Sequence, residues 1–467
     1  MCTKDRLRCL IPAVGKLLDH CLIRSLIESG VAREIVLRLI RSTLEKLRSL
    51  SDDELEKLDL SLDHLAQQVV AQIEERSLQR VINGTGIILH TGLGRAPLSD
   101  SAIQKVEELS GYCSLEIDRQ SGKRGSRDLH IAELLVALTG AEAGLVVNNN
   151  AAALLLILST FAQDREVIVS RGQLVEIGGS FRLPDVMRAG GANLIEVGTT
   201  NRTYCSDYEQ AITEETSILL KVHTSNFKLI GFVAAVPLVE LVNLAAVHDL
   251  LVVDDIGSGA LFDLTKYDLG SEPTAQASIA AGADLVTFSA DKLVGGPQGG
   301  IIVGKGALIA KLKQNPLTRA LRIDKLRLAA LQATLHSYLS GKLTELPIWK
   351  MALRQLSEIK RDAEALAAAL EIPLKREAKV EVQDGVSQLG GGSLPGEEIP
   401  TALVTIEFFH SDVEKVAAQL RMGDPAIFTR ISSGKLLIDL RTIRTADHGV
   451  IVERFRNLSN QRSSVIS

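Results

Sequence analysis

The stretch Ala283–Gly304, ADLVTFSADKLVGGPQGGIIVG, decides how the chain is organised. Its first apolar run, Asp284–Phe288, is rich in β-branched residues and predicts a buried strand, and Ile301–Val303 predicts a second. A polar segment and a glycine-proline turn join the two strands and carry Lys292. Burial of a lysine lowers its pKa and makes the amine a nucleophile or Schiff-base former. Lys292 is therefore a candidate catalytic residue, and an exposed turn lysine is the alternative.

Length and composition predict a globular protein with a large core. The chain has 467 residues, of which 46% are hydrophobic, so two or three domains are expected. No run of about 18 apolar residues occurs and no secretory signal is recognisable, so a cytoplasmic protein without membrane contact is expected. Five cysteines without a CxxC pair predict neither a disulfide framework nor a zinc site, and no metal is expected.

Hydrophobic periodicity divides the chain into three expected domains. Residues 1–80 repeat apolar residues at three- and four-residue steps, which predicts helices. Residues 81–335 alternate short apolar runs with helix-length segments, as in an α/β domain whose mainly parallel sheet is covered on both faces. Residues 336–467 predict a smaller α+β domain, in which residues 385–400, rich in Gly, Ser and Pro, form a loop.

The first 50 residues are the basic part of an acidic protein. They hold ten Lys and Arg against five Asp and Glu, whereas the whole chain has a net charge of −5. One predicted helix has an apolar stripe made of Ile35, Leu39, Ile40, Leu44 and Leu47, and its opposite face carries Arg33, Arg38, Arg41 and Arg48. This arginine face suits a phosphate backbone. A solvated face that only keeps the helices soluble is the alternative.

Polar motifs follow three of the predicted strands. A helix starts at Asn149, Asn150 and Ala151, where free N–H groups suit a phosphate. Asp255 ends another strand and could hold a pyridine nitrogen protonated, while His223 and Asn226 could orient a heteroaromatic ring. Alone, each motif could simply cap a turn. Together with Lys292 they meet the needs of pyridoxal phosphate: an anion seat, an acidic partner and an amine.

Longer motifs carry a resemblance to known families. The stretches His223–Asn226 (HTSN) and Ser289–Gln298 (SADKLVGGPQ) resemble those of cysteine-desulfurase-like pyridoxal enzymes of the aspartate-aminotransferase fold. A closer match, over nearly the whole chain, is similar to the bacterial selenocysteine synthases, L-seryl-tRNA(Sec) selenium transferases. Its motifs are Val81–Gly86 (VINGTG), His90–Leu98 (HTGLGRAPL), Gly122–Arg127 (GKRGSR), Asn148–Ala153 (NNNAAA), Ser170–Gly179 (SRGQLVEIGG), Glu196–Thr203 (EVGTTNRT) and the lysine stretch.

The resemblance implies an activity and an assembly. It implies a homodecamer, a pentamer of dimers, that converts seryl-tRNA(Sec) to selenocysteyl-tRNA(Sec) with selenophosphate. The implied route uses pyridoxal phosphate and passes through an aminoacrylyl intermediate. Residues 1–80 would bind the tRNA, residues 81–335 the cofactor, and residues 336–467 would be the small domain.

The resemblance also implies roles for single residues. Lys292 would form the aldimine, Asp255 would face the ring nitrogen and Asn226 the ring hydroxyl. Other expected cofactor contacts are those of Asn149, Asn150, Ala151, Gln173, His223 and Ser289. Arginines suit a multiply charged donor because the guanidinium group donates several hydrogen bonds. The arginines that the resemblance assigns to this anion are Arg95, Arg319 and Arg322.

Two positions depart from the family pattern. Gly92 stands where Asn is usual, which could loosen the loop of Arg95, and Gln173 stands where Glu is usual, which removes a charge near the expected ring. Two other functions remain open: a related pyridoxal-phosphate lyase or aldolase acting on a small amino acid derivative, and a non-catalytic tRNA-binding scaffold. The lyases generally lack the N-terminal helical domain.

Overall fold

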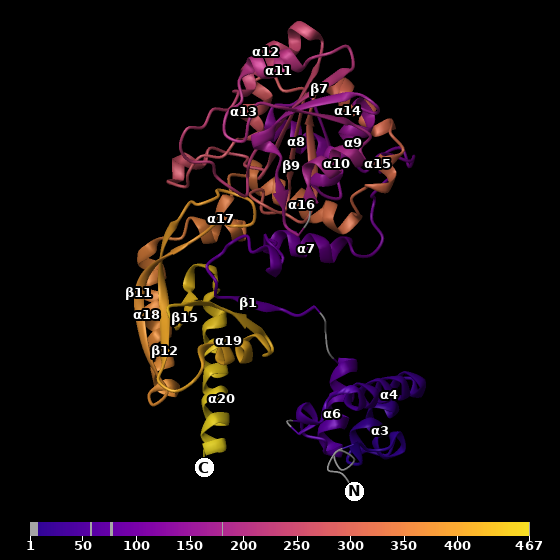
Figure 1. The fold of residues 1–467 in the computed structure, drawn as a ribbon. Helices are drawn as coiled ribbons and strands as arrows, with labels where there is room; N and C mark the ends of the chain where they lie inside the picture. The colour runs from indigo at the N-terminus through magenta and orange to yellow at the C-terminus, as the bar shows by residue number, and fades with distance from the viewer. Residues whose placement is uncertain (1–7, 57, 75–77, 180, 467) are drawn as a thin grey trace. The chain divides into compact units, whose positions relative to one another are not determined.

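The computed structural model describes residues 8–56, 58–74, 78–179 and 181–466. The chain divides into two compact units, Met1–Arg80 and Val81–Ser467 (Figure 1). In the described part of the chain, every helix is too short or too polar to cross a membrane.

The first unit is helical, as its periodicity predicts. Its helices are α2 (Val14–Leu18), α3 (Cys21–Glu28), α4 (Arg33–Ser49), α5 (Asp52–Leu55) and α6 (Leu62–Glu74). Helix α4 buries Val36, Ile40 and Leu44 in the core of this unit. The predicted stripe was wrong at Ile35, which is 47% exposed. Val36 takes its place because it lies four residues before Ile40, on the same helix face.

A seven-stranded sheet forms the centre of the second unit. Its order is β2 (Ala143–Val147), β10 (Gly300–Gly304), β9 (Leu285–Ser289), β8 (Leu251–Gly257), β7 (Thr216–Val222), β3 (Glu166–Ser170) and β6 (Asn193–Val197). Strand β10 runs antiparallel to β2 and β9, and the other neighbours are parallel. The predicted mainly parallel α/β sheet is confirmed, including the strands on either side of Lys292.

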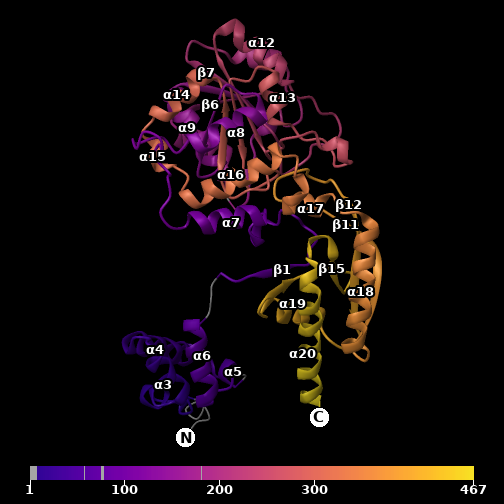
Figure 2. The same ribbon diagram turned by 180° about the vertical axis from the view of Figure 1, so that it is seen from behind.

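Helices cover both faces of this sheet (Figures 1 and 2). On one face, α9 (Asn150–Phe161), α10 (Leu183–Ala189) and α14 (Gly306–Gln314) pack on strand residues such as Val147 and Val253. The other face is covered by α8 (Leu129–Thr139), α16 (Lys325–Leu339), α11 (Cys205–Ala211) and α12 (Leu238–His248). Because alternate strand residues point to opposite faces, Asp255 faces the α9 side and Asp254 the α12 side.

An antiparallel sheet and helices form the C-terminal part of the same unit. Its strands are β11 (Ala378–Ser387), β12 (Ile399–Phe408), β15 (Lys435–Asp439) and β14 (Arg430–Ser432), packed on α18 (Leu356–Leu374) and α20 (His448–Ile466). Strand β1 (Val81–Asn83) pairs with β13 (Ala426–Phe428), so the start of this unit is tied to its C-terminal part. The predicted loop is shorter than expected, residues 388–398, because β11 and β12 pair as far as Ser387 and Ile399.

Candidate functional site

Lys292 lies in the turn between β9 and β10 and is buried. Lys292 is only 4% exposed, so the alternative of an exposed turn lysine is excluded. Burial lowers the pKa of the amine, and the positive charge of Arg95 lowers it further. The carboxylates of Asp255, Asp291 and Glu272 act in the opposite direction. The amine is therefore more readily deprotonated than that of an ordinary lysine.

Asp255 is the buried carboxylate of the same site. Its Oδ1 accepts hydrogen bonds from Asn150 Nδ2 at 2.8 Å, Thr287 Oγ1 at 3.1 Å and Gly257 N at 3.2 Å. Burial raises the pKa of Asp255, while these hydrogen bonds and the charge of Lys292 partly oppose the increase. A carboxylate held in this way is suited to a cationic partner, such as a protonated ring nitrogen.

The N-terminus of α9 lies at the edge of this site. Asn149 caps the helix and accepts from Ala152 N at 2.9 Å, which leaves the backbone N–H groups of Asn150 and Ala151 without an intrahelical acceptor. Strand β10 passes close by, since a Cβ atom on Gly300 would lie 2.0 Å from Asn149 O. Gly300 also pairs with Ser289 of β9. These residues lie together where the sequence predicts an anion seat, and the Asn150 side chain is directed to Asp255.

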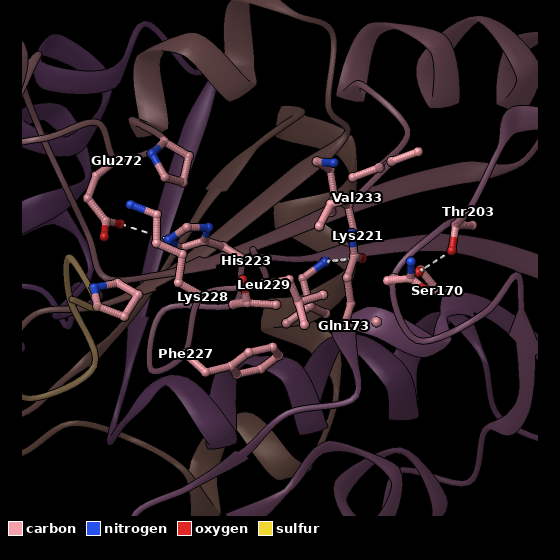
Figure 3. Close-up of a pocket in the computed structure, with 18 of the residues that line it drawn as sticks. Ser170, Gln173, Thr203, Lys221, His223, Phe227, Lys228, Leu229, Val233 and Glu272 are labelled. Carbon is pink, nitrogen blue, oxygen red and sulfur yellow. Dashed lines mark hydrogen bonds and ion pairs between the residues drawn. The ribbon is translucent and has the colours of Figure 1, made fainter. Parts of the chain in front are cut away.

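His223 follows β7 and contacts a second buried carboxylate. Its Nε2 lies 2.9 Å from Glu272 Oε2, and its backbone N donates to Asp255 O at 2.9 Å. Gln173 Oε1 accepts from Val222 N at 2.9 Å, directly before His223. His223 also lines a pocket of about 400 Å³. Figure 3 shows the His223–Glu272 pair at one side of this pocket and the hydrogen-bonded hydroxyls of Ser170 and Thr203 at the other.

The structure adds Ser225 to the residues expected from the sequence. Ser225 is 1% exposed, and its hydroxyl has no hydrogen-bond partner within the described ranges. A Cβ atom on Gly392 would lie 3.0 Å from Lys292 Nζ and 3.6 Å from Ser225 Oγ, so both groups face the same small space. Asn226, by contrast, is exposed and donates to Glu176 O at 2.7 Å. Ser225 lies within the motif His223–Asn226. The regular alternation of side-chain directions stops at the end of β7, so it does not predict which residues of this motif are buried.

The three arginines expected to bind an anion differ in their surroundings. Arg95 donates to Asp291 Oδ2 at 2.9 Å, next to Lys292. Arg322 pairs with Val147 at the edge of the sheet, and its Nη1 lies 3.5 Å from Glu116 Oε1. Arg319 lies on the short helix α15 (Leu317–Ala320) and is exposed. Arg95 and Arg322 therefore belong to the carboxyl-end edge of the sheet, and each is held by a carboxylate.

The two departures from the family pattern have small local effects. A Cβ atom on Gly92 would lie 3.5 Å from the His90 ring, an ordinary contact, so the position has room for a side chain. Arg95 is held without it, because Arg95 N donates to His90 O at 3.0 Å and the guanidinium binds Asp291. Gln173 uses its amide oxygen as an acceptor, which a carboxylate oxygen could also do.

Comparison with known proteins gives the family. The family model described as L-seryl-tRNA selenium transferase matches residues 81–444. The chain belongs to this family. The L-seryl-tRNA(Sec) selenium transferase of Alkaliphilus oremlandii is 44% identical over 465 residues, which cover 97% of this chain and 99% of the relative. The enzyme of the same name from Geobacter sulfurreducens is 45% identical over 457 residues, covering 96% and 99%. The family recognised in the sequence is confirmed, and with it the enzyme class, a transferase.

A solved structure supports the fold. D-glucosaminate-6-phosphate ammonia-lyase superposes with a TM-score of 0.59 and 22% identity, covering 84% of this chain and 98% of that one. At this identity the likeness concerns the fold alone. The expected α/β fold, with an additional C-terminal sheet, is confirmed for this member of the L-seryl-tRNA selenium transferase family.

Ser225→Ala is expected to affect stability and cofactor affinity in opposite directions. Removing a buried hydroxyl without a partner should leave the free energy of unfolding of the cofactor-free protein unchanged or raise it by about 1 kcal/mol. If the hydroxyl binds the cofactor, the dissociation constant for pyridoxal phosphate should increase about tenfold. Urea unfolding and a titration of visible absorbance measure the two effects. A cofactor affinity equal to that of the wild type would remove Ser225 from the site.

Asp254→Asn is expected to stabilise the protein at neutral pH. Burial raises the pKa of Asp254 from 3.8 to about 6, against the hydrogen bond from Ser278 and the charge of Lys221. The native state therefore binds more protons than the unfolded state between these values, and stability falls as pH rises from about 4 to about 6. The variant lacks the ionisable group, so its free energy of unfolding should be about 2–3 kcal/mol higher than that of the wild type at pH 7.5. At pH 4 its free energy of unfolding should be close to that of the wild type.

Urea unfolding of both proteins at the two pH values tests this expectation. Asparagine keeps an oxygen that can accept from Ser278 Oγ, which donates at 2.6 Å to Asp254, so the hydrogen bond does not confound the comparison. A variant that is less stable than the wild type at pH 7.5 would show that attraction between Asp254 and Lys221 outweighs the cost of burial.

Proposed function

We propose that this protein converts seryl-tRNA(Sec) to selenocysteyl-tRNA(Sec), with selenophosphate as the selenium donor and pyridoxal phosphate as cofactor. The named activity of relatives that match 96–97% of the chain supports the reaction. The observation that carries the proposal is the buried amine of Lys292, whose pKa is lowered in a site that also contains Asp255 and the start of α9.

The residues present fit pyridoxal phosphate. Lys292 would hold the cofactor aldehyde, Asp255 its ring nitrogen, and the backbone N–H groups at Asn150 and Ala151, with Ser289, its phosphate. Ser225 supports this fit independently, since its buried hydroxyl lies beside Lys292 and has no hydrogen-bond partner among the residues that the structure describes. When bound, the cofactor supplies an electron sink for the substrate once the α-proton leaves.

The side chains of the site divide the remaining tasks. The Lys292 amine, once free, can take the proton from the seryl α-carbon, because its lowered pKa brings it closer to neutral pH. Arg95 and Arg322 lie at the same sheet edge and are suited to a multiply charged donor, with Arg319 as a third, exposed arginine. Asp291 holds Arg95 at a fixed place in the absence of an anion.

The proposal extends to the partners and the assembly. We assign tRNA binding to the unit Met1–Arg80, supported by its excess of basic residues. We also propose a homodecamer of five dimers, and a cytoplasmic location, as the resemblance to selenocysteine synthases implies.

The deciding experiment supplies the purified protein with pyridoxal phosphate, selenophosphate and seryl-tRNA(Sec), and identifies the aminoacyl group on the tRNA by mass spectrometry. Selenocysteyl-tRNA(Sec) is the expected product. Turnover of a free amino acid derivative without a tRNA product would instead identify a lyase or aldolase. Failure to bind the cofactor, with tRNA binding retained, would identify a non-catalytic scaffold.

A further inference from the structure

Glu272 is a buried carboxylate to which three separate parts of the chain bind. Its side chain is 1% exposed. Oε2 lies 2.9 Å from His223 Nε2 and accepts from Ser258 Oγ at 2.6 Å. Oε1 accepts from Leu394 N at 2.6 Å. His223 follows β7, Ser258 follows β8 and Leu394 lies between β11 and β12, so one side chain joins the large sheet to the C-terminal loop.

The loop held by Glu272 is packed against Lys292. Gly390, Gly391 and Gly392 have φ values of 70°, 62° and 80°, and Leu394 has a φ of 48°. A Cβ atom on Gly391 would lie 2.3 Å from Leu89 O, and one on Gly392 would lie 3.0 Å from Lys292 Nζ. Positive φ is unfavourable for leucine, so contacts around Leu394 must hold this backbone. Its hydrogen bond to a carboxylate is of the stronger, charge-assisted kind.

The same carboxylate determines which nitrogen of His223 carries a proton. Glu272 has only acceptors when ionised, so it favours the proton of the neutral His223 ring on Nε2, which lies 2.9 Å from Oε2, and leaves Nδ1 as the acceptor. Burial acts to raise the pKa of Glu272, but the contacts from His223, Ser258 and Leu394 together lower it. The carboxylate is therefore ionised at neutral pH. The other charged groups that act on this pair are Asp254, on His223, and Lys292, on Glu272.

We propose that Glu272 is a positioning residue of the active site. Through Oε2 it fixes the orientation and tautomer of His223, and through Oε1 it holds the Gly390–Leu394 loop against Lys292. The inference rests on the proposed function for the role of the site. The contacts that support it do not depend on the substrate.

Glu272→Gln separates the two contacts. The glutamine oxygen must face Leu394 N, because an amide nitrogen there would bring two donors together. Its amide nitrogen then faces Ser258 and His223, so His223 Nε2 becomes an acceptor and the proton of the neutral ring moves to Nδ1. The loop therefore stays attached, while the proton of the neutral His223 ring changes from Nε2 to Nδ1. Glu272→Ala removes both contacts.

The test uses the full chain loaded with pyridoxal phosphate. Hydrogen exchange of residues 388–398 reports on the loop, and the pH midpoint of the cofactor's visible absorption reports on the histidine. For E272Q we expect exchange within about twofold of the wild type, a shifted midpoint and a kcat about tenfold lower. For E272A we expect exchange in the loop to be about ten- to a hundredfold faster.

Glu397→Gln is the matched control. Glu397 lies three residues after Leu394, is half-buried and pairs with exposed Lys228 at 3.1 Å. Because an ion pair in contact with solvent contributes little to stability, its replacement should change neither readout. If E272A does not fold, Glu272→Asp replaces it, because the shorter side chain cannot span both contacts and should also accelerate exchange. Wild-type exchange in E272A or E272D, or a wild-type pH midpoint in E272Q, would overturn the proposal. Neither hydrogen exchange nor the pH midpoint of absorption requires tRNA. Both can therefore be measured even if the proposed reaction does not occur.

Discussion

The Lys292→Ala protein is expected to be colourless and to have less than about a thousandth of wild-type activity. Two functions are lost together: covalent attachment of the cofactor and the amine that moves the substrate proton. Because Lys292 is buried beside Asp255 and Asp291, water has little room to replace the amine. Reduction with borohydride, followed by peptide mass spectrometry, should locate the cofactor on residue 292 in the wild type and nowhere in the variant.

Lys221 provides the matched control for this prediction. Its amine is also partly buried and has a pKa lowered by burial, but it lies on the opposite face of the sheet and donates to Val236 O at 2.7 Å. Lys221→Ala should therefore keep the borohydride-stable cofactor at residue 292. Cofactor trapped on Lys221 in the Lys292→Ala protein would contradict the assignment. Binding of tRNA should be nearly unchanged in both variants.

Replacing the arginine face of α4 is expected to abolish most of the affinity for tRNA. Arg33, Arg38, Arg41 and Arg48 are all exposed, while Val36, Ile40 and Leu44 of the same helix are buried. Each arginine that contacts a phosphate contributes about one unit to the slope of log affinity against log salt. Changing all four to glutamine should therefore lower that slope by up to about four units, measured by filter binding between 50 and 200 mM salt.

Exposed basic residues of the other unit give the control. Arg188, Lys342 and Arg361 are exposed, Lys105 is half-exposed, and all four lie beyond Arg80. Changing these four to glutamine removes the same charge and should leave the salt slope within about one unit of the wild type. If the salt slope decreased equally in the two quadruple variants, net charge alone would account for tRNA affinity and α4 would have no special role. An unchanged slope in the α4 variant would mean that its arginine face only keeps the protein soluble.

Local sequence was sufficient for the elements around the site. The β-branched runs before and after Lys292 predicted β9 and β10, and the apolar runs before Asn149, His223 and Asp255 predicted β2, β7 and β8. These strands are buried on both faces, so their sequences are nearly continuous apolar runs. Strand β11 was not predicted, although its start, AKVEVQ, alternates apolar and polar residues as a half-exposed strand does. Its end was assigned to the loop rich in Gly, Ser and Pro that was expected from Gly385 onward.

The sequence alone determined the family and the α/β class, and it predicted Lys292 and Asp255 as the residues that most define the candidate site, because strand patterns and motifs are local properties. Only the tertiary structure showed that Lys292 is buried, that Ser225 faces it while Asn226 faces away, and that Glu272 joins His223 to Leu394. These contacts join residues that are between 49 and 122 positions apart or lie beyond the end of a strand. No local pattern encodes them, since they depend on which strands become neighbours and on how a loop of the C-terminal part packs against the large sheet.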